Sequence, residues 1–263
     1  MRLTGRPFVI TVDLNRLCRF DPNRLAGCRI LDIGCGTGRH TSAVFRFPKV
    51  VAMGVDINFD DVVEAKKRLN THKELGDHGV GECGVSAADI CELPFKDNFF
   101  DLVICSEVLE HIQDHKTAVS EAVRVLKPSK TLVVSVPRYL PERICWTLSD
   151  NYHTVRNGHV RIYKKKTLVD LLESAGLTQW GFHFAHSLHV PYWWLKCLVG
   201  PEREDCRSIN AYHRLLVWDM MKKPWITQFV DKMLNPILGK SMVLYMKKEE
   251  KKYLRHEDTK ALR

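Results

Sequence analysis

Short apolar segments alternate with longer segments of helical periodicity along the first two thirds of the chain. Arg29–Ile33, Val50–Asp56 and Phe100–Cys105 are apolar at nearly every position and show no regular alternation with polar residues. Strands of this kind are buried on both faces, which is typical of a parallel sheet covered by helices on each side. The same pattern predicts further strands at Val85–Ala88, Thr131–Val136, Thr178–Phe184 and Ser241–Met246.

The segments between these strands predict the helices. Asn58 is suited to cap the N-terminus of a helix that runs to Leu69. Gly176 is suited to the position that follows the end of a helix over Lys164–Ala175. Further helices are predicted at Arg39–Phe47, around Val108–His111 and at Thr117–Leu126, whereas 70–81 and 127–129 are predicted to be a loop and a turn.

The segment between the last two predicted strands is longer than a connection in a compact domain usually is. It holds four of the six tryptophans, at positions 193, 194, 218 and 225. We divide the chain into an N-terminal extension (1–26), a main domain (27–184 with 241–247), a helical insertion (185–240) and a charged tail (248–263) that we expect to be frayed. The insertion combines aromatic and apolar residues with lysines. This composition suits a lid over a hydrophobic pocket, a surface in a membrane interface, or a small subdomain with its own core.

The excess positive charge of the chain lies outside residues 27–137, the segment that contains five of the predicted strands. The formal net charge is +9. Residues 27–137 hold 13 basic and 16 acidic residues, a balance of −3, so the remainder carries +12. Such a distribution indicates an anionic partner, which is a membrane surface, a nucleic acid or an acidic substrate, or else a solvated basic surface.

Two observations favour the cytoplasm as compartment. The apolar run Phe8–Val12 is too short for a signal sequence, and no run approaches the roughly 20 apolar residues of a membrane span. The nine cysteines include no Cys-x-x-Cys pair and are expected to be reduced thiols.

A glycine-rich turn follows the first predicted strand and precedes a helix. Gly34, Gly36 and Gly38 allow a ligand to approach the backbone closely at the N-terminus of that helix. Asp56 ends the second strand, where a carboxylate can accept both hydroxyls of a ribose, and Asp89 follows the third strand at the same edge of the sheet.

The acidic and basic residues around this turn disfavour a dinucleotide. Arg39 occupies the position of the third glycine in the dinucleotide fingerprint. Asp32 would place a negative charge beside a pyrophosphate, but it suits a cationic ligand. The residues therefore favour a nucleoside with a positively charged, amino-acid-like end over a nicotinamide dinucleotide.

Four segments in order resemble the motifs of class I S-adenosylmethionine-dependent methyltransferases. They read LDIGCGTG at 31–38, VDI at 55–57, ADICELPF at 88–95 and FDLVICSEVLEHI at 100–112. The likeness is strongest to the branch that includes the ubiquinone- and menaquinone-biosynthesis methyltransferases. The resemblance implies an α/β, Rossmann-like fold with a mostly parallel seven-stranded sheet, helices on both faces and a helical, aromatic-rich insertion before the last strand. It also implies S-adenosylmethionine as cofactor.

The resemblance implies roles for individual residues at the strand ends. The glycine turn and Asp32 would hold the methionine end, and Asp56 would bind the ribose. Ile57 would lie against the adenine, Asp89 and the backbone of Ile90 would bind its edge, and backbone atoms of Cys105 would line the methionine side. The residues assigned to the cofactor are Asp32, Gly34, Cys35, Gly36, Gly38, Asp56, Ile57, Asp89, Ile90 and Cys105.

Three side chains are candidates for the chemistry: Glu107, Glu110 and His111. Methyl transfer from a sulfonium mainly requires alignment of the acceptor and exclusion of water, and a base is needed only for a hydroxyl, an acidic carbon or a protonated amine. On the predicted helix the three would share one face, and His111 is the candidate base. A purely structural role, in capping the helix and shaping the pocket, is the alternative. The E-x-x-E-H spacing also resembles the magnesium ligands of small-RNA 2′-O-methyltransferases and some quinone O-methyltransferases, with His159 as a further ligand. We assign no metal.

The sequence favours a small or lipid-like acceptor, methylated at oxygen or carbon, and a peripheral membrane contact through 185–240. Base N-methyltransferases usually carry [DN]-P-P-[YF] after the fourth strand, where this chain reads Ser106-Glu107-Val108-Leu109. Nucleic acid is therefore the less favoured acceptor. The alternatives are an RNA methyltransferase that binds through its basic flanks and a non-catalytic module that retains the cofactor site.

Overall fold

The computed structural model describes residues 10–250, except 19, 20, 22, 155–157, 201, 202 and 204. Its seven strands form one sheet in the order β3-β2-β1-β4-β5-β7-β6. They are β1 (Arg29–Ile33), β2 (Val51–Asp56), β3 (Glu82–Ala87), β4 (Phe100–Ser106), β5 (Leu126–Pro137), β6 (Leu177–Ala185) and β7 (Ser241–Lys248). The first five strands are parallel, and β7 alone runs opposite to its neighbours β5 and β6. The predicted fold class is confirmed.

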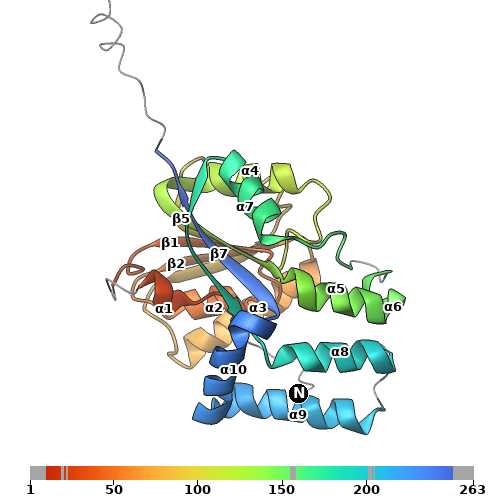
Figure 1. Ribbon diagram of the computed structural model, residues 1–263. Helices are drawn as coiled ribbons and strands as arrows, with labels where there is room; N and C mark the ends of the chain where they lie inside the picture. The colour runs from red at the N-terminus through yellow and green to blue at the C-terminus, as the bar shows by residue number, and fades with distance from the viewer. Residues whose placement is uncertain are drawn as a thin grey trace, which may run out of the picture.

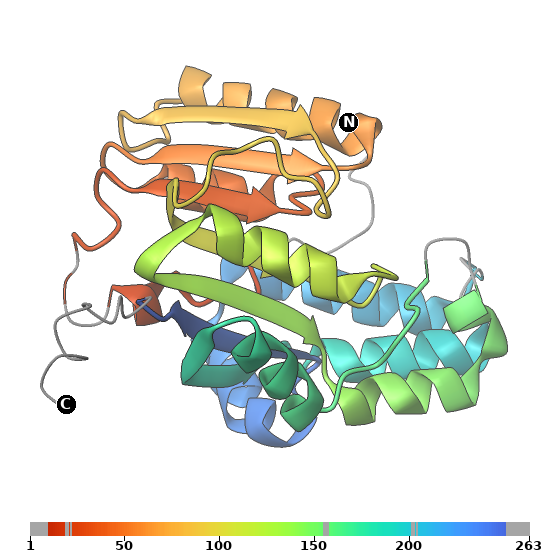
Figure 2. The ribbon, with the colours of Figure 1, turned by 90° about the horizontal axis from the view of Figure 1, so that it is seen from above.

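Helices cover both faces of the sheet (Figures 1 and 2). On one face α4 (His115–Val125) and α7 (Lys165–Ser174) pack in a core with Leu132 and Leu244. On the other face lie α1 (Leu14–Leu17), α2 (Arg39–Phe45) and α3 (Phe59–Glu74), whose core includes Phe45 and Tyr245. Burial on both faces explains why the strands are apolar at consecutive positions.

The strand order creates a switch point beside β1. From β1 the chain proceeds outward to β2 and β3, then returns to pair β4 with the other side of β1. In open α/β sheets the ligand binds at the carboxyl ends of the strands where the order reverses. Here that edge carries the glycine turn after β1 and residues 106–111 after β4.

The prediction of a helix around Val108–His111 is wrong, because residues 107–114 form turns before α4 begins at His115. Glu107 has a positive φ of 57°, which a helix does not accept. The guanidinium of Arg161 donates to three backbone carbonyls of this segment, those of Leu109, Ile112 and Gln113. A side chain distant in sequence therefore binds acceptors that a helix would use internally.

Other differences are smaller. Helix α3 runs to Glu74, five residues beyond the predicted end, so the loop predicted for 70–81 is shorter. Residues 127–129 belong to β5, which has a bulge opposite Phe100–Leu102, instead of forming a separate turn. Helices α5 (Tyr139–Leu148) and α6 (Asp150–Thr154) were not predicted. The caps at Asn58 and Gly176 are found as expected: the Asn58 side chain accepts from Asp60 N, and Gly176 has a φ of 82°.

The insertion consists of α8 (His189–Val199), α9 (Arg207–Lys222) and α10 (Trp225–Leu238). Figure 1 shows α5, α8 and α9 stacked on one another, with α10 at one end of the stack. A small core around Tyr192, Ile209 and Leu216 joins α8 to α9. Helix α10 contacts β6, yet none of its residues is buried.

The ends of the chain are described only in part. Residues 1–9 and 251–263 lie outside the described residues, and so does most of the predicted charged tail. Lys248, assigned to that tail, is the last residue of β7. Within the described part of the chain, no helix is long and apolar enough to cross a membrane.

Candidate functional site

The glycine turn requires glycine for two different reasons. Gly34, Gly36 and Gly38 all have positive φ, of 64°, 50° and 79°. A Cβ on Gly34 would lie 2.2 Å from Cγ2 of Val108, so this position has no room for a side chain. A Cβ on Gly36 would meet nothing within 4 Å. The backbone at Gly36 therefore borders open space from which a ligand can reach its peptide groups.

Asp56 joins the glycine turn to the end of β2. Its Oδ2 accepts from the backbone N–H of Gly36 at 2.8 Å, and its Oδ1 accepts from that of Asn58 at 2.9 Å. The N–H of Cys35 donates to the carbonyl of Val55 at 2.9 Å. An ionised carboxylate has about four acceptor positions. Each oxygen of Asp56 therefore retains capacity for one hydroxyl donor, as the two hydroxyls of a ribose require.

Asp32 is buried beneath this turn, and only one of its two carboxylate oxygens has hydrogen-bond partners among the described residues. Oδ2 accepts from the N–H and the hydroxyl of Thr41, at 2.9 and 2.6 Å. Oδ1 is buried and has no hydrogen-bond partner among the described residues. Burial raises the pKa of Asp32 to about 6, although the bonds from Thr41 lower it. A buried carboxylate with an unpaired oxygen is stabilised by a cationic group and destabilised by an anionic one.

The residues assigned to the adenine lie beside Asp56. The N–H of Ala88 donates to the carbonyl of Asp56 at 3.0 Å, which brings Asp89 and Ile90 to the end of β2. Asp89 is exposed, and its Oδ1 accepts from the N–H of Cys91. Ile57 is 74% exposed, which is unusual for a large apolar side chain next to a buried strand. The exposed face of Ile57 is suited to packing against a flat ring.

The side chains after β4 differ in environment although they are neighbours in sequence. Oε1 of Glu107 accepts from the Ser135 hydroxyl at 3.0 Å. Glu110 is 1% exposed, and neither of its carboxyl oxygens has a hydrogen-bond partner among the described residues. Burial first, and then the charge of Glu107, raise the pKa of Glu110 well above its ordinary value. These surroundings therefore favour the protonated form of Glu110 over its carboxylate.

His111 is the member of the trio whose geometry suits a base. Its Nδ1 lies 3.2 Å from the carbonyl oxygen of Gly158. A carbonyl can only accept, so Nδ1 carries the proton and Nε2 carries the lone pair of the neutral ring. Nε2 lies 4.0 Å from Oε1 of Glu110. The proton-accepting atom of His111 thus lies near the buried carboxyl group of Glu110.

Glu142 on α5 belongs to the same cluster and was not predicted. It is 2% exposed and accepts from Nδ1 of His159 at 2.5 Å and from Nε1 of Trp146 at 3.2 Å. Burial alone would raise the pKa of Glu142, but the hydrogen bond and charge of His159 lower it below its ordinary value. Glu142 is therefore an ionised carboxylate that orients His159. No spacing in the sequence connects these two residues, because they come from separate segments.

The cluster has the composition of a divalent-cation site. Glu110, His111 and His159 each offer one ligand atom, and these atoms lie within 4.8 Å of one another. Imidazole and carboxylate groups bind such ions at about 2.0–2.2 Å. The assignment of no metal to this protein stays a prediction.

The Cys105 side chain lies near both Asp32 and Glu110. It is buried in the core at the end of β4. Burial raises the pKa of its thiol, and the nearby acidic groups of Glu110 and Asp32 raise it further. The acidic group beneath the glycine turn and the one in the His111 cluster therefore both lie near the end of β4.

Comparison with known proteins agrees with this architecture. Residues 31–134 match the family described as a methyltransferase domain. This chain carries a class I S-adenosylmethionine-dependent methyltransferase domain. An O-methyltransferase of Aspergillus nomiae is 30% identical over 133 residues, which cover 49% of this chain and 57% of that protein. A ubiquinone/menaquinone biosynthesis C-methyltransferase of Psychromonas ingrahamii is 34% identical over 119 residues, 44% of this chain and 46% of that protein.

The fold of the methyltransferase domain is also found among solved structures. A protein of Bacillus halodurans described as a methyltransferase superposes with a TM-score of 0.59 at 20% identity, over 90% of this chain and 99% of that chain. The alignments span only 36% to 57% of the length of the first curated relatives. The sequence likeness to these relatives thus covers only part of their length.

The residues present in the methyltransferase domain fit S-adenosylmethionine. The unpaired Oδ1 of Asp32 suits a cationic methionine end, the open space at Gly36 admits a ligand to the backbone, and Asp56 can accept two hydroxyls. A dinucleotide would place a pyrophosphate beside Asp32, which buries like charges together.

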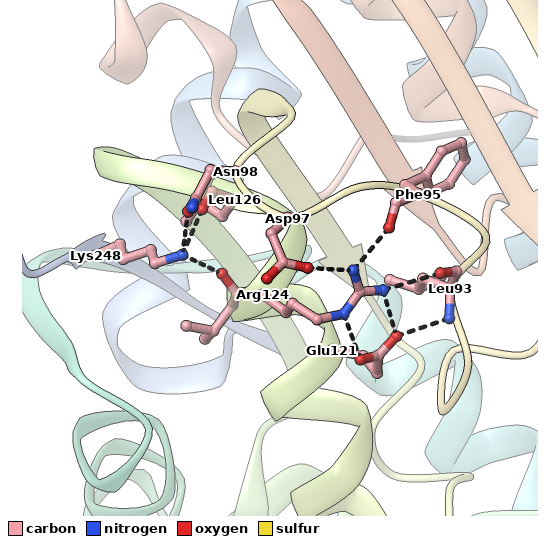
Figure 3. Close-up of polar contacts among 9 residues, drawn as sticks. Leu93, Phe95, Asp97, Asn98, Glu121, Arg124, Leu126 and Lys248 are labelled. Atoms are coloured by element: carbon pink, nitrogen blue, oxygen red, sulfur yellow. Dashed lines mark hydrogen bonds and ion pairs between the residues drawn. The ribbon is translucent and has the colours of Figure 1, made fainter.

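A network of hydrogen bonds around Arg124 holds the segment that follows Asp89, and this network was not predicted from the sequence. Figure 3 shows Arg124 of α4 donating to the carbonyls of Leu93 and Phe95 and to Asp97, while Glu121 binds both Arg124 and the N–H of Leu93. Lys248 similarly donates to Asn98 and to the carbonyls of Val123 and Leu126. In the sequence Arg124 and Glu121 look like an ordinary surface pair on a helix, so no local signal identified their role.

Proposed function

We propose that this protein transfers the methyl group of S-adenosylmethionine to a hydrophobic, lipid-like acceptor, at an oxygen or an acidic carbon. One observation carries the proposal. A buried carboxylate with an unpaired oxygen, Asp32, and a histidine whose Nε2 carries the lone pair, His111, both lie near the end of β4. The first suits a cationic methyl donor, and the second suits removal of a proton from an acceptor.

The cofactor supplies a methyl group on a sulfonium, which is already an excellent leaving group. The glycine turn and Asp56 would fix its position, and the residues after β4 would align the acceptor for in-line displacement. Nε2 of His111 would take the proton from the acceptor. The resulting positive charge lies 4.0 Å from Glu110 and would favour ionisation of that carboxyl group.

A row of aromatic rings supports the hydrophobic acceptor. The rings of His111 and His159 have centroids 4.9 Å apart, and Tyr152 lies 6.3 Å from His159. Trp193 on α8 follows at 5.8 Å from Tyr152. This row leads from the candidate base into the insertion, where rings can pack against an apolar or aromatic acceptor.

Transfer of label tests the proposal. The protein would be incubated with methyl-labelled S-adenosylmethionine and with separate lipid, small-metabolite and RNA fractions. We expect label in the lipid fraction, and loss of that label in the His111→Ala variant while cofactor binding is retained. Label confined to RNA would contradict the acceptor class. Cofactor binding without label in any fraction would contradict the proposed activity and favour a non-catalytic module.

A further inference from the structure

Helix α10 presents an apolar stripe to solvent. Trp225, Phe229, Met233 and Ile237 follow one another at intervals of four residues, so they line one side of the helix. Their exposures run from 59% to 76%, and Ile226 beside them is 56% exposed. Exposed apolar side chains are common singly, whereas a continuous stripe marks an interaction surface.

The end of α9 extends this apolar surface. Met221, near the last residue of α9, is 72% exposed, and Trp218 one turn earlier is also exposed. The chain passes from Met221 through Lys222 and Lys223 to Trp225 at the start of α10. Apolar and basic side chains therefore meet at the corner between the two helices.

The acidic residues of α9 and α10 are turned inward. Asp219 and Asp231 are the only acidic residues between positions 207 and 240. Asp219 accepts from the side chains of Thr227 and Gln228. Asp231 accepts from the hydroxyl of Ser187, from the N–H of Leu188 and from Asn235. Internal hydrogen bonds thus use both carboxylates.

The basic residues of the same helices remain on the outside. Arg214, Lys222, Lys223 and Lys232 are all exposed. The solvent side of this pair of helices therefore combines an apolar stripe with positive charges that no acidic residue of the two helices neutralises. These properties match a lipid bilayer, which has an apolar interior and can have negatively charged headgroups.

The dimensions favour a lipid surface over a second copy of the chain. The 14 residues of α10 extend over about 21 Å, and a stripe about 10 Å wide offers roughly 200 Å², far below the ~800 Å² per partner of a stable interface. A symmetric dimer through α10 would also bring the basic residues of the two copies together. A helix that lies in the plane of a bilayer needs only one apolar side, and anionic headgroups neutralise the flanking lysines.

We propose that the α9–α10 corner and the stripe Trp225–Phe229–Met233–Ile237 dock on an anionic phospholipid surface, with α10 lying in the interface. The tryptophans would sit at headgroup level and the lysines would contact the headgroups. The contact would bring the aromatic row of the acceptor side close to the membrane. The docking stands on α10 itself, and its test involves no methyl transfer, so its failure is distinguishable from failure of the proposed activity.

Vesicle co-sedimentation with the full chain tests the docking. Vesicles of phosphatidylcholine alone would be compared with vesicles containing about 30% phosphatidylserine, with tryptophan emission as a second readout. We expect binding to the anionic vesicles, a blue shift of the emission, and release by salt. The double variant Trp225→Ser/Phe229→Ser should bind about tenfold or more weakly. Lys222→Glu/Lys223→Glu should abolish the preference for anionic lipid.

Two matched controls change similar residues elsewhere. Leu75→Ser/Val80→Ser removes two equally exposed apolar side chains near the end of α3, and Lys66→Glu/Lys73→Glu reverses two exposed charges on α3. Both should bind like the original protein, and circular dichroism verifies that every variant is folded. Absence of binding to anionic vesicles overturns the proposal, as does equal loss in the controls. A dimer in solution that Phe229→Glu dissociates, without vesicle binding, would assign the stripe to self-association instead.

Discussion

The cofactor side and the acceptor side of this site are built in different ways. On the cofactor side, the glycine turn, Asp56 and Asp89 come from consecutive strand ends, and backbone N–H groups hold their carboxylates. On the acceptor side, Glu110, Glu142, His159 and Trp193 come from four separate segments. Side chains bring them together, and Tyr152 lies between His159 and Trp193. A site built from backbone groups at strand ends can be predicted from local sequence. A site built from side chains that are distant in sequence depends on how the segments that carry them pack.

The largest expected effect is on the acceptor side. His111→Ala should lower kcat by about 10²–10⁴-fold, because it removes the proton acceptor. The dissociation constant for S-adenosylmethionine, measured by calorimetry, should stay unchanged. The control is His78→Ala. This histidine stacks on Phe45 and precedes β3, so it lies away from the carboxyl ends of the strands that form the site. Equal rates for His111→Ala and the original protein would show that positioning alone drives the reaction.

The cofactor side is tested by Asp56→Ala. The loss of hydrogen bonds to a charged group and of the support for Gly36 should weaken binding of S-adenosylmethionine by about 2–4 kcal/mol. Calorimetry measures this directly, and Asp60→Ala, an exposed acid in the first turn of α3, is the control. An unchanged dissociation constant would mean that Asp56 supports the glycine turn but does not bind the cofactor.

Asp32 makes cofactor binding depend on pH. Its pKa is about 6 in the free protein because of burial, and a cationic ligand favours its ionised form. Affinity for S-adenosylmethionine should therefore fall about tenfold per pH unit below pH 6 and level off above it. The ligand-free protein should lose stability as pH rises from about 4 to 6, because the folded state holds a proton that the unfolded state releases. Asp32→Asn should remove both dependences in calorimetric and unfolding titrations.

Arg124 fixes the segment that follows Asp89 to helix α4. Arg124→Met should destabilise the segment after Asp89 by about 1–2 kcal/mol, since the carbonyls of Leu93 and Phe95 lose their donor. Hydrogen exchange of residues 89–99 should accelerate, and cofactor affinity should weaken a few-fold. Lys166→Met, which removes a fully exposed ion pair with Asp170, should change neither. Unaltered exchange in 89–99 would contradict the role assigned to Arg124.

The smallest expected effect is that of a chelator. Because we assign no metal, EDTA should leave the rate unchanged and added Mg²⁺ should not raise it. Loss of activity that Mg²⁺ restores, together with the same loss in His159→Ala, would instead identify Glu110, His111 and His159 as ligands.

The prediction was most accurate where neighbours in sequence are neighbours in space. The strands, the Asn58 cap and the C-terminal Gly176 depend on apolar periodicity and on the conformations of a few adjacent residues. It failed at Val108–His111, where the local pattern is compatible with a helix but Arg161, about 50 positions later, binds the backbone carbonyls. Helix α5 was missed, and Glu142 with it.

The sequence by itself determined the parallel sheet, the order of its motifs and the placement of two acids and a glycine turn at one edge, because these follow from short-range periodicity and from backbone conformations that only certain residues adopt. Only the tertiary structure decided in which direction the pKa of each buried carboxyl group shifts and which nitrogen of His111 carries the lone pair. Burial and the hydrogen-bond partner set those properties, and both arise when segments far apart in the chain are brought into contact. The same holds for α10, because the composition of 185–240 is compatible with a lid, a membrane surface or an independent core, and only the packing leaves the apolar residues of α10 in solvent.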